Sequence, residues 1–377
     1  MAGIYLHIPF CKQACHYCDF HFSTSLRSKD AMLEALNSEL KARVSYLEGQ
    51  PIETIYLGGG TPSLLSTDEL QRLFETIHQH YNVAANAEVT LEANPDDLTY
   101  LKILELRRTP VNRLSIGIQS FRDEDLRWMN RAHTVSQADY SVKCAQDRGF
   151  ENITIDLIYS IPGMGLNEWQ HTVRKAIDLQ VQHISAYSLT IEPKTVLGNQ
   201  LAKGEMQPAS DSVGEEQFLS LVHALKRADF EQYEVSNFCR PGMHSRHNSA
   251  YWKGAHYLGI GPSAHSFNGN TRQWNVANNA RYIAGISGGT PSFELEVLGP
   301  SARFNEYLMT RLRTTWGIDL VYLQHTFGID VWAKENEQLL QYEAQGWLMR
   351  EGNTVRLTEQ GLLRADRIAS NLFIVET

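Results

Sequence analysis

Hydrophobic positions in the first two thirds of the chain fall into short runs rich in Ile, Val, Leu and Tyr, each followed by a longer stretch with helical spacing. This alternation is typical of repeated strand-helix units and predicts a parallel sheet. The predicted strands are residues 3–9, 54–57, 88–93, 113–119, 153–161 and 183–191. The predicted helices are residues 30–47, 67–80, 123–148, 167–179 and 213–230.

Six such units predict an α/β fold, namely a partial (β/α)6 barrel of the TIM type. In barrels of this kind the chemistry collects at the carboxyl ends of the strands. We therefore look for a functional site in the residues that directly follow each predicted strand.

The regular alternation stops at about residue 230. Residues 231–300, rich in Gly, Asn, His and aromatic side chains, read as an irregular and potentially functional connecting region that contains the motif HNSAYW. Residues 301–377 predict helices, a hairpin of 347–350 with 354–357, and a final helix, which together resemble a winged helix. We therefore expect three parts: a barrel (1–230), a connecting region (231–300) and a smaller C-terminal α+β domain (301–377).

Composition and charge narrow the function. A hydrophobic content of 42% in 377 residues is enough for a large core, and the formal charge of -9 argues against general binding of nucleic acid or anionic membranes. Acidic residues outnumber basic ones in the C-terminal part, so a DNA-binding winged helix is not favoured. Because no stretch has the roughly 18 apolar residues of a membrane span and the first strand begins almost at Met1, we expect a cytoplasmic protein.

Three of the five cysteines, Cys11, Cys15 and Cys18, lie within eight positions directly after the first predicted strand. Thiolates are the ligands of iron-sulfur clusters, and three of them on a four-iron cube leave one iron open. Cys144 and Cys239 read as small buried apolar side chains.

A zinc site completed by His16 or His21 is the alternative, because three cysteines and one histidine are a legitimate zinc ligand set. Zinc knuckles usually pair two close-spaced ligand couples, whereas here no distant couple is found. The spacing therefore favours a 4Fe-4S cluster.

At these residues the chain resembles the radical S-adenosylmethionine (SAM) superfamily, whose cluster motif has the same C-x3-C-x2-C spacing. The resemblance implies that the open iron binds SAM and that Tyr17 contacts its adenine. A glycine-rich turn, YLGGGTPS at residues 56–63, follows the second strand, and glycines let a ligand approach the backbone closely. By the same resemblance Gly60 and Thr61, with Pro62 beside them, bind the SAM amino group.

Polar residues stand at the remaining strand ends: Glu92, Gln119, Arg131 and Asp156. A carboxylate can accept hydrogen bonds from ribose hydroxyls or from the SAM ammonium, and an arginine can pair with the SAM carboxylate. Asp156 lies inside an apolar run, so its buried charge needs a partner.

The motifs YLHIPFCxxxCxxCDF, LGGGTPS, LEANP, RLSIGIQSF, IDLIYSIPGM and HNSAYW, taken in order, resemble the oxygen-independent coproporphyrinogen-III dehydrogenase family across essentially the whole chain. The resemblance implies a set of SAM contacts at Tyr5, Gly60, Thr61, Glu92, Gln119, Arg131 and Asp156.

Two departures point to one branch of that family. Phe20 stands where the dehydrogenase has a further cysteine, and the long segment that precedes the cluster in the dehydrogenase is absent. Both departures, with HNSAYW, resemble the haem-chaperone branch called HemW. This implies a protein without dehydrogenase activity that binds haem and delivers it to haem-dependent respiratory apo-proteins, and that needs an electron donor.

His247 is the candidate haem ligand, because a neutral imidazole is a common axial donor and Tyr251 and Trp252 could stack on a porphyrin. The alternatives are that His247 only makes hydrogen bonds in a loop, or that His244, His256 or His265 is the ligand. The alternative activity is that of the dehydrogenase, which uses a 5'-deoxyadenosyl radical to convert coproporphyrinogen III.

Overall fold

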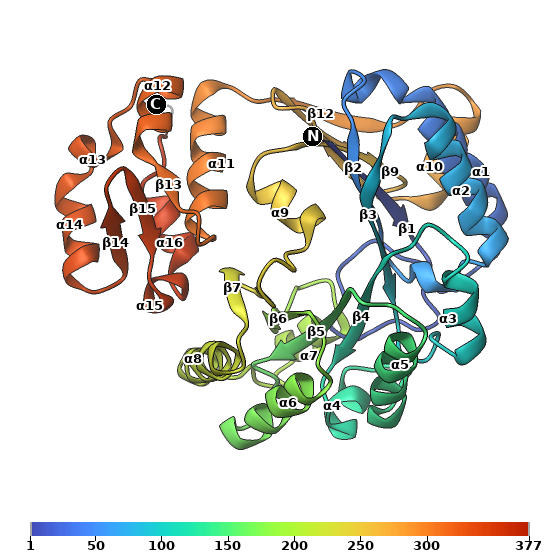
Figure 1. Ribbon diagram of the computed structural model, residues 1–377, viewed down its shortest axis with the longest axis horizontal. Helices are drawn as coiled ribbons and strands as arrows, with labels where there is room; N and C mark the ends of the chain where they lie inside the picture. The colour runs from blue at the N-terminus through green and yellow to red at the C-terminus, as the bar shows by residue number, and fades with distance from the viewer. Residues whose placement is uncertain (1, 376–377) are drawn as a thin grey trace.

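The computed structural model describes residues 2–375 and contains one large sheet and one small sheet (Figure 1). The large sheet has the strand order β12-β11-β10-β9-β1-β2-β3-β4-β5-β6-β8-β7, and the small one has the order β13-β15-β14. Neighbouring strands from β1 to β6 all pair in parallel, so the six predicted strand-helix units form the centre of an open, partial barrel.

The strands of the structure are β1 (Ala2–Ile8), β2 (Ile52–Gly59), β3 (Val83–Ala93), β4 (Arg113–Gln119), β5 (Ile153–Tyr159), β6 (His183–Ser188), β7 (Glu231–Glu234), β8 (Asn237–Cys239), β9 (His256–Ile260), β10 (His265–Phe267), β11 (Thr271–Asn275), β12 (Phe293–Val297), β13 (Ile318–Asp319), β14 (Leu348–Glu351) and β15 (Thr354–Leu357). The helices of the barrel are α1 (Lys29–Ala42), η1 (Val44–Leu47), η2 (Pro62–Leu64), α2 (Thr67–His80), α3 (Tyr100–Leu106), α4 (Asp123–Trp128), α5 (Val135–Asp147), α6 (Leu166–Asp178), α7 (Val196–Ala202) and α8 (Asp211–Arg227). The later helices are α9 (Arg246–Trp252), α10 (Asn279–Ser287), α11 (Pro300–Leu312), α12 (Leu320–Phe327), α13 (Val331–Lys334), α14 (Asn336–Ala344), α15 (Glu359–Leu362) and α16 (Ala365–Asn371).

Helix α2 shows why the predicted elements form where they do. Its Ser66 side chain accepts a hydrogen bond from the Glu69 N–H while the Glu69 carboxylate accepts one from the Ser66 N–H, so two otherwise unpaired donors at the helix start are satisfied. Leu70, Phe74 and Ile77 recur at helical spacing and are buried. The predicted span, 67–80, is the observed one.

The helix predicted over residues 123–148 is instead two helices, α4 and α5. Asn130, between them, has a left-handed φ of 57° and its side-chain amide donates to the Ala14 carbonyl at 2.7 Å. Thr134 then caps α5 through the Gln137 N–H. Apolar periodicity continues across the break, but these local hydrogen bonds compete with the helix and bring the loop against the cysteine segment.

The secondary structure of residues 231–300 corrects our expectation of an irregular region. Strands β7 and β8 extend the sheet beyond β6, and β9 pairs in parallel with the other side of β1, followed by antiparallel β10, β11 and β12. The motif HNSAYW is helix α9, capped by Ser245, not a loop. These strands are short and contain Gly and Asn, so their hydrophobic pattern does not predict strands. They form because they pair with the edge strands of the barrel. The boundaries at 230 and 300 stay predictions.

The C-terminal helices and the small sheet lie beside the barrel (Figure 1). The predicted hairpin is present as β14 and β15, and β13 adds a third strand to it. The Val235 N–H donates to the Arg313 carbonyl at 2.9 Å, and Glu234 forms a β-bridge with Thr314, so β7 is tied to the C-terminal part. Within residues 2–375, no helix has the length and apolar character that crossing a membrane requires.

Candidate functional site

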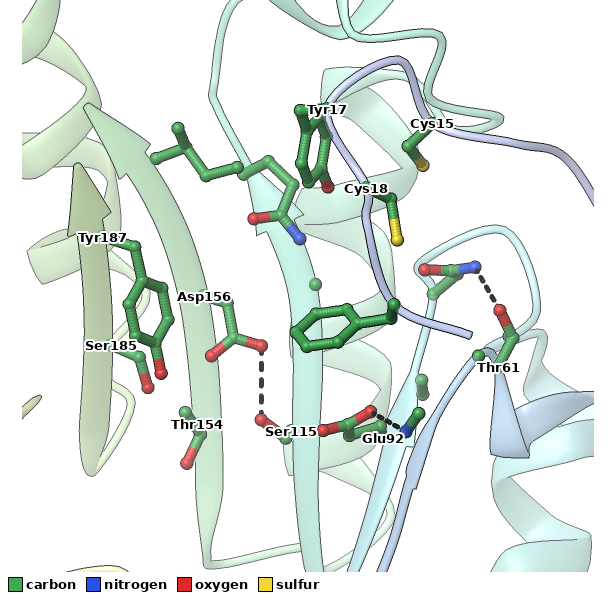
Figure 2. Close-up of a pocket in the computed structure, with 18 of the residues that line it drawn as sticks. Cys15, Tyr17, Cys18, Thr61, Glu92, Ser115, Thr154, Asp156, Ser185 and Tyr187 are labelled. Atoms are coloured by element: carbon green, nitrogen blue, oxygen red, sulfur yellow. Dashed lines mark hydrogen bonds between the residues drawn. The ribbon is translucent and has the colours of Figure 1, made fainter. Parts of the chain in front are cut away.

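A cavity of about 470 Å³ opens at the carboxyl ends of the parallel strands, the position expected for this fold (Figure 2). Its wall joins the cysteine loop, the glycine turn, strands β3 to β6 and the start of α9. Of the predicted site residues, those that line it are Cys11, Cys15, Tyr17, Cys18, Gly60, Thr61, Glu92, Gln119, Arg131 and Asp156.

The three cysteine side chains are free, half-buried and all on the cavity wall. The Thr61 hydroxyl donates to the Cys11 Sγ and the Arg131 guanidinium donates to the Cys15 Sγ, each at 3.4 Å. Burial raises the pKa of the Cys11 thiol and raises that of Cys18 to about 12. Three free thiols on one cavity wall, with donors already aimed at two of the sulfurs, fit an iron-sulfur cluster in their donor chemistry.

The histidines of the zinc alternative are engaged elsewhere. His16 Nδ1 is hydrogen bonded to the Trp128 carbonyl at 2.8 Å, and His21 Nε2 to the Asn279 side chain at 2.7 Å. In the part of the chain that the structure describes, no group of three or more His, Cys, Asp or Glu side chains is arranged to hold a single metal ion. The geometry thus offers no assembled Cys3His set.

The glycine turn packs against the cysteine loop. The Gly60 N–H donates to the Ile8 carbonyl at 2.9 Å and the Thr61 N–H to the Phe10 carbonyl at 2.7 Å. A Cβ on Gly60 would stand 2.6 Å from the Phe10 carbonyl oxygen. The lack of a side chain at Gly60 therefore lets the cysteine loop pack closely against the glycine turn. Gly60 also lines the cavity, as expected.

Glu92 on β3 and Asp156 on β5 line the cavity on either side of β4 (Figure 2). Glu92 accepts from the Tyr56 hydroxyl at 2.8 Å and the Gly59 N–H at 3.1 Å, and Asp156 accepts from the Ser115 hydroxyl at 3.3 Å. Burial raises the pKa of Glu92 to about 7 and that of Asp156 to about 6. Both carboxyls are thus partly desolvated acceptors for hydroxyl or ammonium donors.

Gln119 and Arg131 complete the predicted polar set. Gln119 ends β4 beside a register shift, with a left-handed φ of 69° that is unusual for a residue with a side chain, and it lines the cavity. Arg131 donates to the Asn94 side chain and the Gly117 carbonyl, both at 2.7 Å. Its buried Nε has no hydrogen-bond partner among the described residues.

Two predicted SAM contacts do not line the cavity. The Tyr5 hydroxyl is hydrogen bonded to His7 Nδ1 at 3.1 Å, and its ring stacks on Tyr56 at 6.1 Å. Pro62 is buried at the first position of η2, where its ring starts the turn. The structure therefore places both behind the wall, one layer from the cavity.

His247 also lies outside the cavity, and its side chain is only 3% exposed. Its Nδ1 is hydrogen bonded to Thr54 at 2.8 Å, its Nε2 to the Tyr251 hydroxyl at 3.3 Å, and its ring stacks on Tyr56 at 5.0 Å. Burial lowers its pKa to about 3. In this conformation neither ring nitrogen is available to haem iron, so an axial role requires a movement of α9.

The other three histidines differ in their surroundings. His256 is hydrogen bonded to Gln50 at 2.7 Å, His265 is exposed and stacks on Trp274, and His244 packs against Tyr233 and Trp316. None of the three lines the cavity.

Our sequence reasoning missed much of the polar wall, although a signal was present. In RLSIGIQ the apolar residues alternate strictly with polar or small ones, and Arg113, Ser115, Gly117 and Gln119 all line the cavity. Residues of β5, which pairs with β4, and of β6, which pairs with β5, extend this set of cavity-lining residues across the sheet. The further lining residues on these strands are Thr154, Ile158, Ser185, Tyr187 and Ser188. Asn248 on α9 and its cap residue Ser245 also line the cavity.

Comparison with known proteins agrees with this architecture. The sequence model of the Radical SAM superfamily matches residues 5–176, and that of the HemN C-terminal domain matches residues 298–364. Escherichia coli coproporphyrinogen III oxidase (HemN), described as a radical SAM enzyme, superposes with a TM-score of 0.85 at 21% identity, covering 99% of this chain and 90% of that one. The shared fold is therefore an open radical SAM barrel with a HemN-type C-terminal domain.

Curated relatives match along nearly the whole chain. The protein named heme chaperone HemW of Mycobacterium tuberculosis is 35% identical over 375 residues, covering 98% of this chain and 94% of the relative. The HemW of Bacillus subtilis is 34% identical, covering 98% of both chains. A mouse protein named radical S-adenosyl methionine domain-containing protein 1, mitochondrial, is 31% identical, covering 98% and 87%. On this evidence the chain belongs to the HemW family of radical SAM proteins.

Proposed function

We propose that this protein is a haem chaperone that binds haem and delivers it to haem-dependent respiratory proteins, using a 4Fe-4S cluster and SAM. The observation that carries the proposal is full-length similarity to proteins named heme chaperone HemW. The donor set on the cavity wall supports the cofactor part of it.

Cys11, Cys15 and Cys18 would hold the cluster. The Thr61 hydroxyl and the Arg131 guanidinium would donate to ligating sulfurs, and such donors stabilise negative charge on sulfur. The half-buried position of the three thiols leaves their cavity side open for a small ligand.

SAM would lie in the cavity beside the cysteine loop, with Tyr17, Gly60 and Thr61 near the cluster. Arg131, a cationic side chain on the cavity wall, suits the SAM carboxylate, and Glu92 and Asp156 suit its ammonium or ribose hydroxyls. Gln119 would form hydrogen bonds with the polar groups of SAM that the two carboxylates leave unpaired. A cluster with SAM bound supplies one-electron chemistry at the SAM sulfonium, for which an electron donor is required.

The acceptors we propose are respiratory apo-proteins, some of them membrane-associated. We place the protein in the cytoplasm, where a reducing environment keeps thiols available for a cluster. All five cysteines are unpaired in the structure.

Oxygen-independent dehydrogenation of coproporphyrinogen III is the second candidate, favoured by the fold shared with HemN. Against it stands Phe20, which replaces the further cysteine expected of a dehydrogenase. This side chain is 67% exposed and lies on the cavity wall, so the difference falls at the site itself.

One sample tests both candidates. The protein is reconstituted anaerobically with iron, sulfide, SAM and reductant, then haem binding is followed by absorbance and protoporphyrin formation from coproporphyrinogen III is assayed. We expect stoichiometric haem and no protoporphyrin. Turnover would establish the dehydrogenase, and the absence of both haem binding and turnover would reject both functions.

A further inference from the structure

The Tyr56 side chain touches both the cavity and His247. It lies on β2, its hydroxyl donates to Glu92 on the cavity wall at 2.8 Å, and its ring stacks on the His247 ring at a centroid distance of 5.0 Å and an angle of 26°. Tyr56 is the first residue of the motif YLGGGTPS, and neither the motif nor the resemblance gave it a role.

On its other side, His247 belongs to a short helix that contacts with the barrel hold in place. Helix α9 has seven residues, and the buried Glu88 carboxylate accepts hydrogen bonds from the backbone N–H groups of Arg246 at 3.1 Å and His247 at 3.0 Å. The His247 ring adds bonds to Thr54 and Tyr251. A seven-residue helix is not stable alone, so these contacts with the barrel hold it.

The cavity also reaches this helix directly, because Asn248 and the capping Ser245 line it while His247 points away. Adjacent residues of a helix point about 100° apart, so one short helix faces both the cavity and the interior. Movement of α9 would therefore alter the cavity wall and release the histidine together.

We propose that Tyr56 couples the cavity to α9, so that SAM on Glu92 and haem iron on His247 weaken each other's binding. The inference rests on the proposed function, and it deepens that function by giving the two ligands an order of action. SAM in place makes withdrawal of the histidine more costly, and departure of SAM makes it less costly.

The sign follows from the hydrogen bonds. A cationic or hydroxyl donor of SAM on Glu92 favours its ionised form, and a carboxylate can accept more donors than the two it now has. The Tyr56 hydroxyl then donates to a full negative charge, which makes a stronger bond. A Tyr56 ring held by this bond stays stacked on His247. Withdrawing that histidine to bind iron therefore requires more free energy when SAM is bound than when it is absent.

Coupling between two binding sites is reciprocal. We therefore expect saturating SAM to raise the haem Kd of the reconstituted protein about fivefold, and haem to raise the SAM Kd by the same factor. Haem titrations followed by absorbance, with and without SAM, measure the first effect, and equilibrium dialysis of SAM measures the second.

The test variant is Tyr56→Phe, which removes the hydroxyl and keeps the ring on His247. We expect the ratio of the haem Kd values with and without SAM to fall to about one. Tyr251→Phe removes a hydroxyl that is hydrogen bonded to His247 and not to Glu92, so it should keep the wild-type ratio. An equal ratio in wild type and Tyr56→Phe, or a ratio of one in wild type, overturns the coupling.

A readout without haem separates this inference from the proposed function. SAM should slow hydrogen exchange of the backbone amides of residues 246–252 in the wild type but not in Tyr56→Phe. If exchange responds in this way and no haem binds, the chaperone proposal fails and the link from Glu92 to α9 stands. If haem binds and exchange in the wild type ignores SAM, the proposed function stands and the coupling is wrong.

Discussion

The two elements that we expected to bind iron differ in their surroundings. The cysteine loop after β1 is half-buried and its three sulfurs lie on an open cavity, whereas His247 on α9 is sealed in the interior with both ring nitrogens hydrogen bonded. The three thiols are thus accessible from the cavity, whereas the histidine must first be released. A ligand motif predicts the kind of atom, but only the packing around it decides whether that atom can be reached.

The first experiment tests the cysteine loop on the cavity and has the largest expected effect. Cys15→Ala removes one of three thiolates, so we expect iron and sulfide per chain after anaerobic reconstitution to fall at least tenfold. Cys144→Ala is the matched control, because that cysteine is buried in α5 away from the cavity. Full iron and sulfide content in Cys15→Ala, or zinc bound in place of the cluster, would contradict the assignment of these cysteines to a 4Fe-4S cluster.

Because His247 is buried, we expect its replacement to destabilise the protein. His247→Ala should lower the free energy of unfolding of the protein without haem by about 2–4 kcal/mol, because it leaves a hole under Tyr56 and removes partners from Thr54 and Tyr251. Urea unfolding measures this. His265→Ala, at an exposed histidine that also stacks on a tryptophan, should cost less than about 1 kcal/mol. Equal losses would show that His247 is not packed as described.

The comparison also depends on how the cysteine loop is held. Gly60→Ala should cost about 2 kcal/mol and reduce cluster content, because its Cβ would press on the Ile8 and Phe10 carbonyl oxygens. Gly299→Ala has nothing within 4 Å of the new Cβ and should cost less than about 1 kcal/mol. Unchanged stability and cluster content in Gly60→Ala would mean that the two loops are not packed against each other.

The smallest effect concerns the cavity carboxylates. The pKa of Glu92, about 7, lies above its ordinary value of 4.5, so the folded protein binds this proton more tightly than the unfolded chain does. The free energy of unfolding should therefore be greatest in acid and fall as the pH rises from about 4.5 through 7. Glu92→Gln should remove about 1–2 kcal/mol of this fall.

Urea unfolding of both proteins at pH 5 and pH 7 makes that comparison. A wild-type stability that falls no more than the stability of Glu92→Gln would show that Glu92 is well solvated. Burial also raises the pKa of Asp156, to about 6, so Asp156 contributes in the same direction, and its charge adds to the rise at Glu92.

The sequence by itself determined the six parallel strands, the hairpin at the C-terminus and the residue types of the site. These follow from local causes: apolar runs of strand length, the capping box of α2, and three cysteines held within eight positions. Short-range spacing needs no knowledge of the rest of the chain, which is why Cys11, Cys15 and Cys18 could be assigned before the fold was known.

Only the tertiary structure decided what those residues face. Strands β7 to β12 exist because the edges of the barrel pair with them, Tyr5 and Pro62 lie one layer behind the cavity, and α9 turns His247 inward and Asn248 toward the cavity. Each of these depends on contacts between residues far apart in sequence: Glu88 with His247, Thr54 with His247, β1 with β9. Period and spacing do not encode such contacts, because they arise only when separate elements share one core.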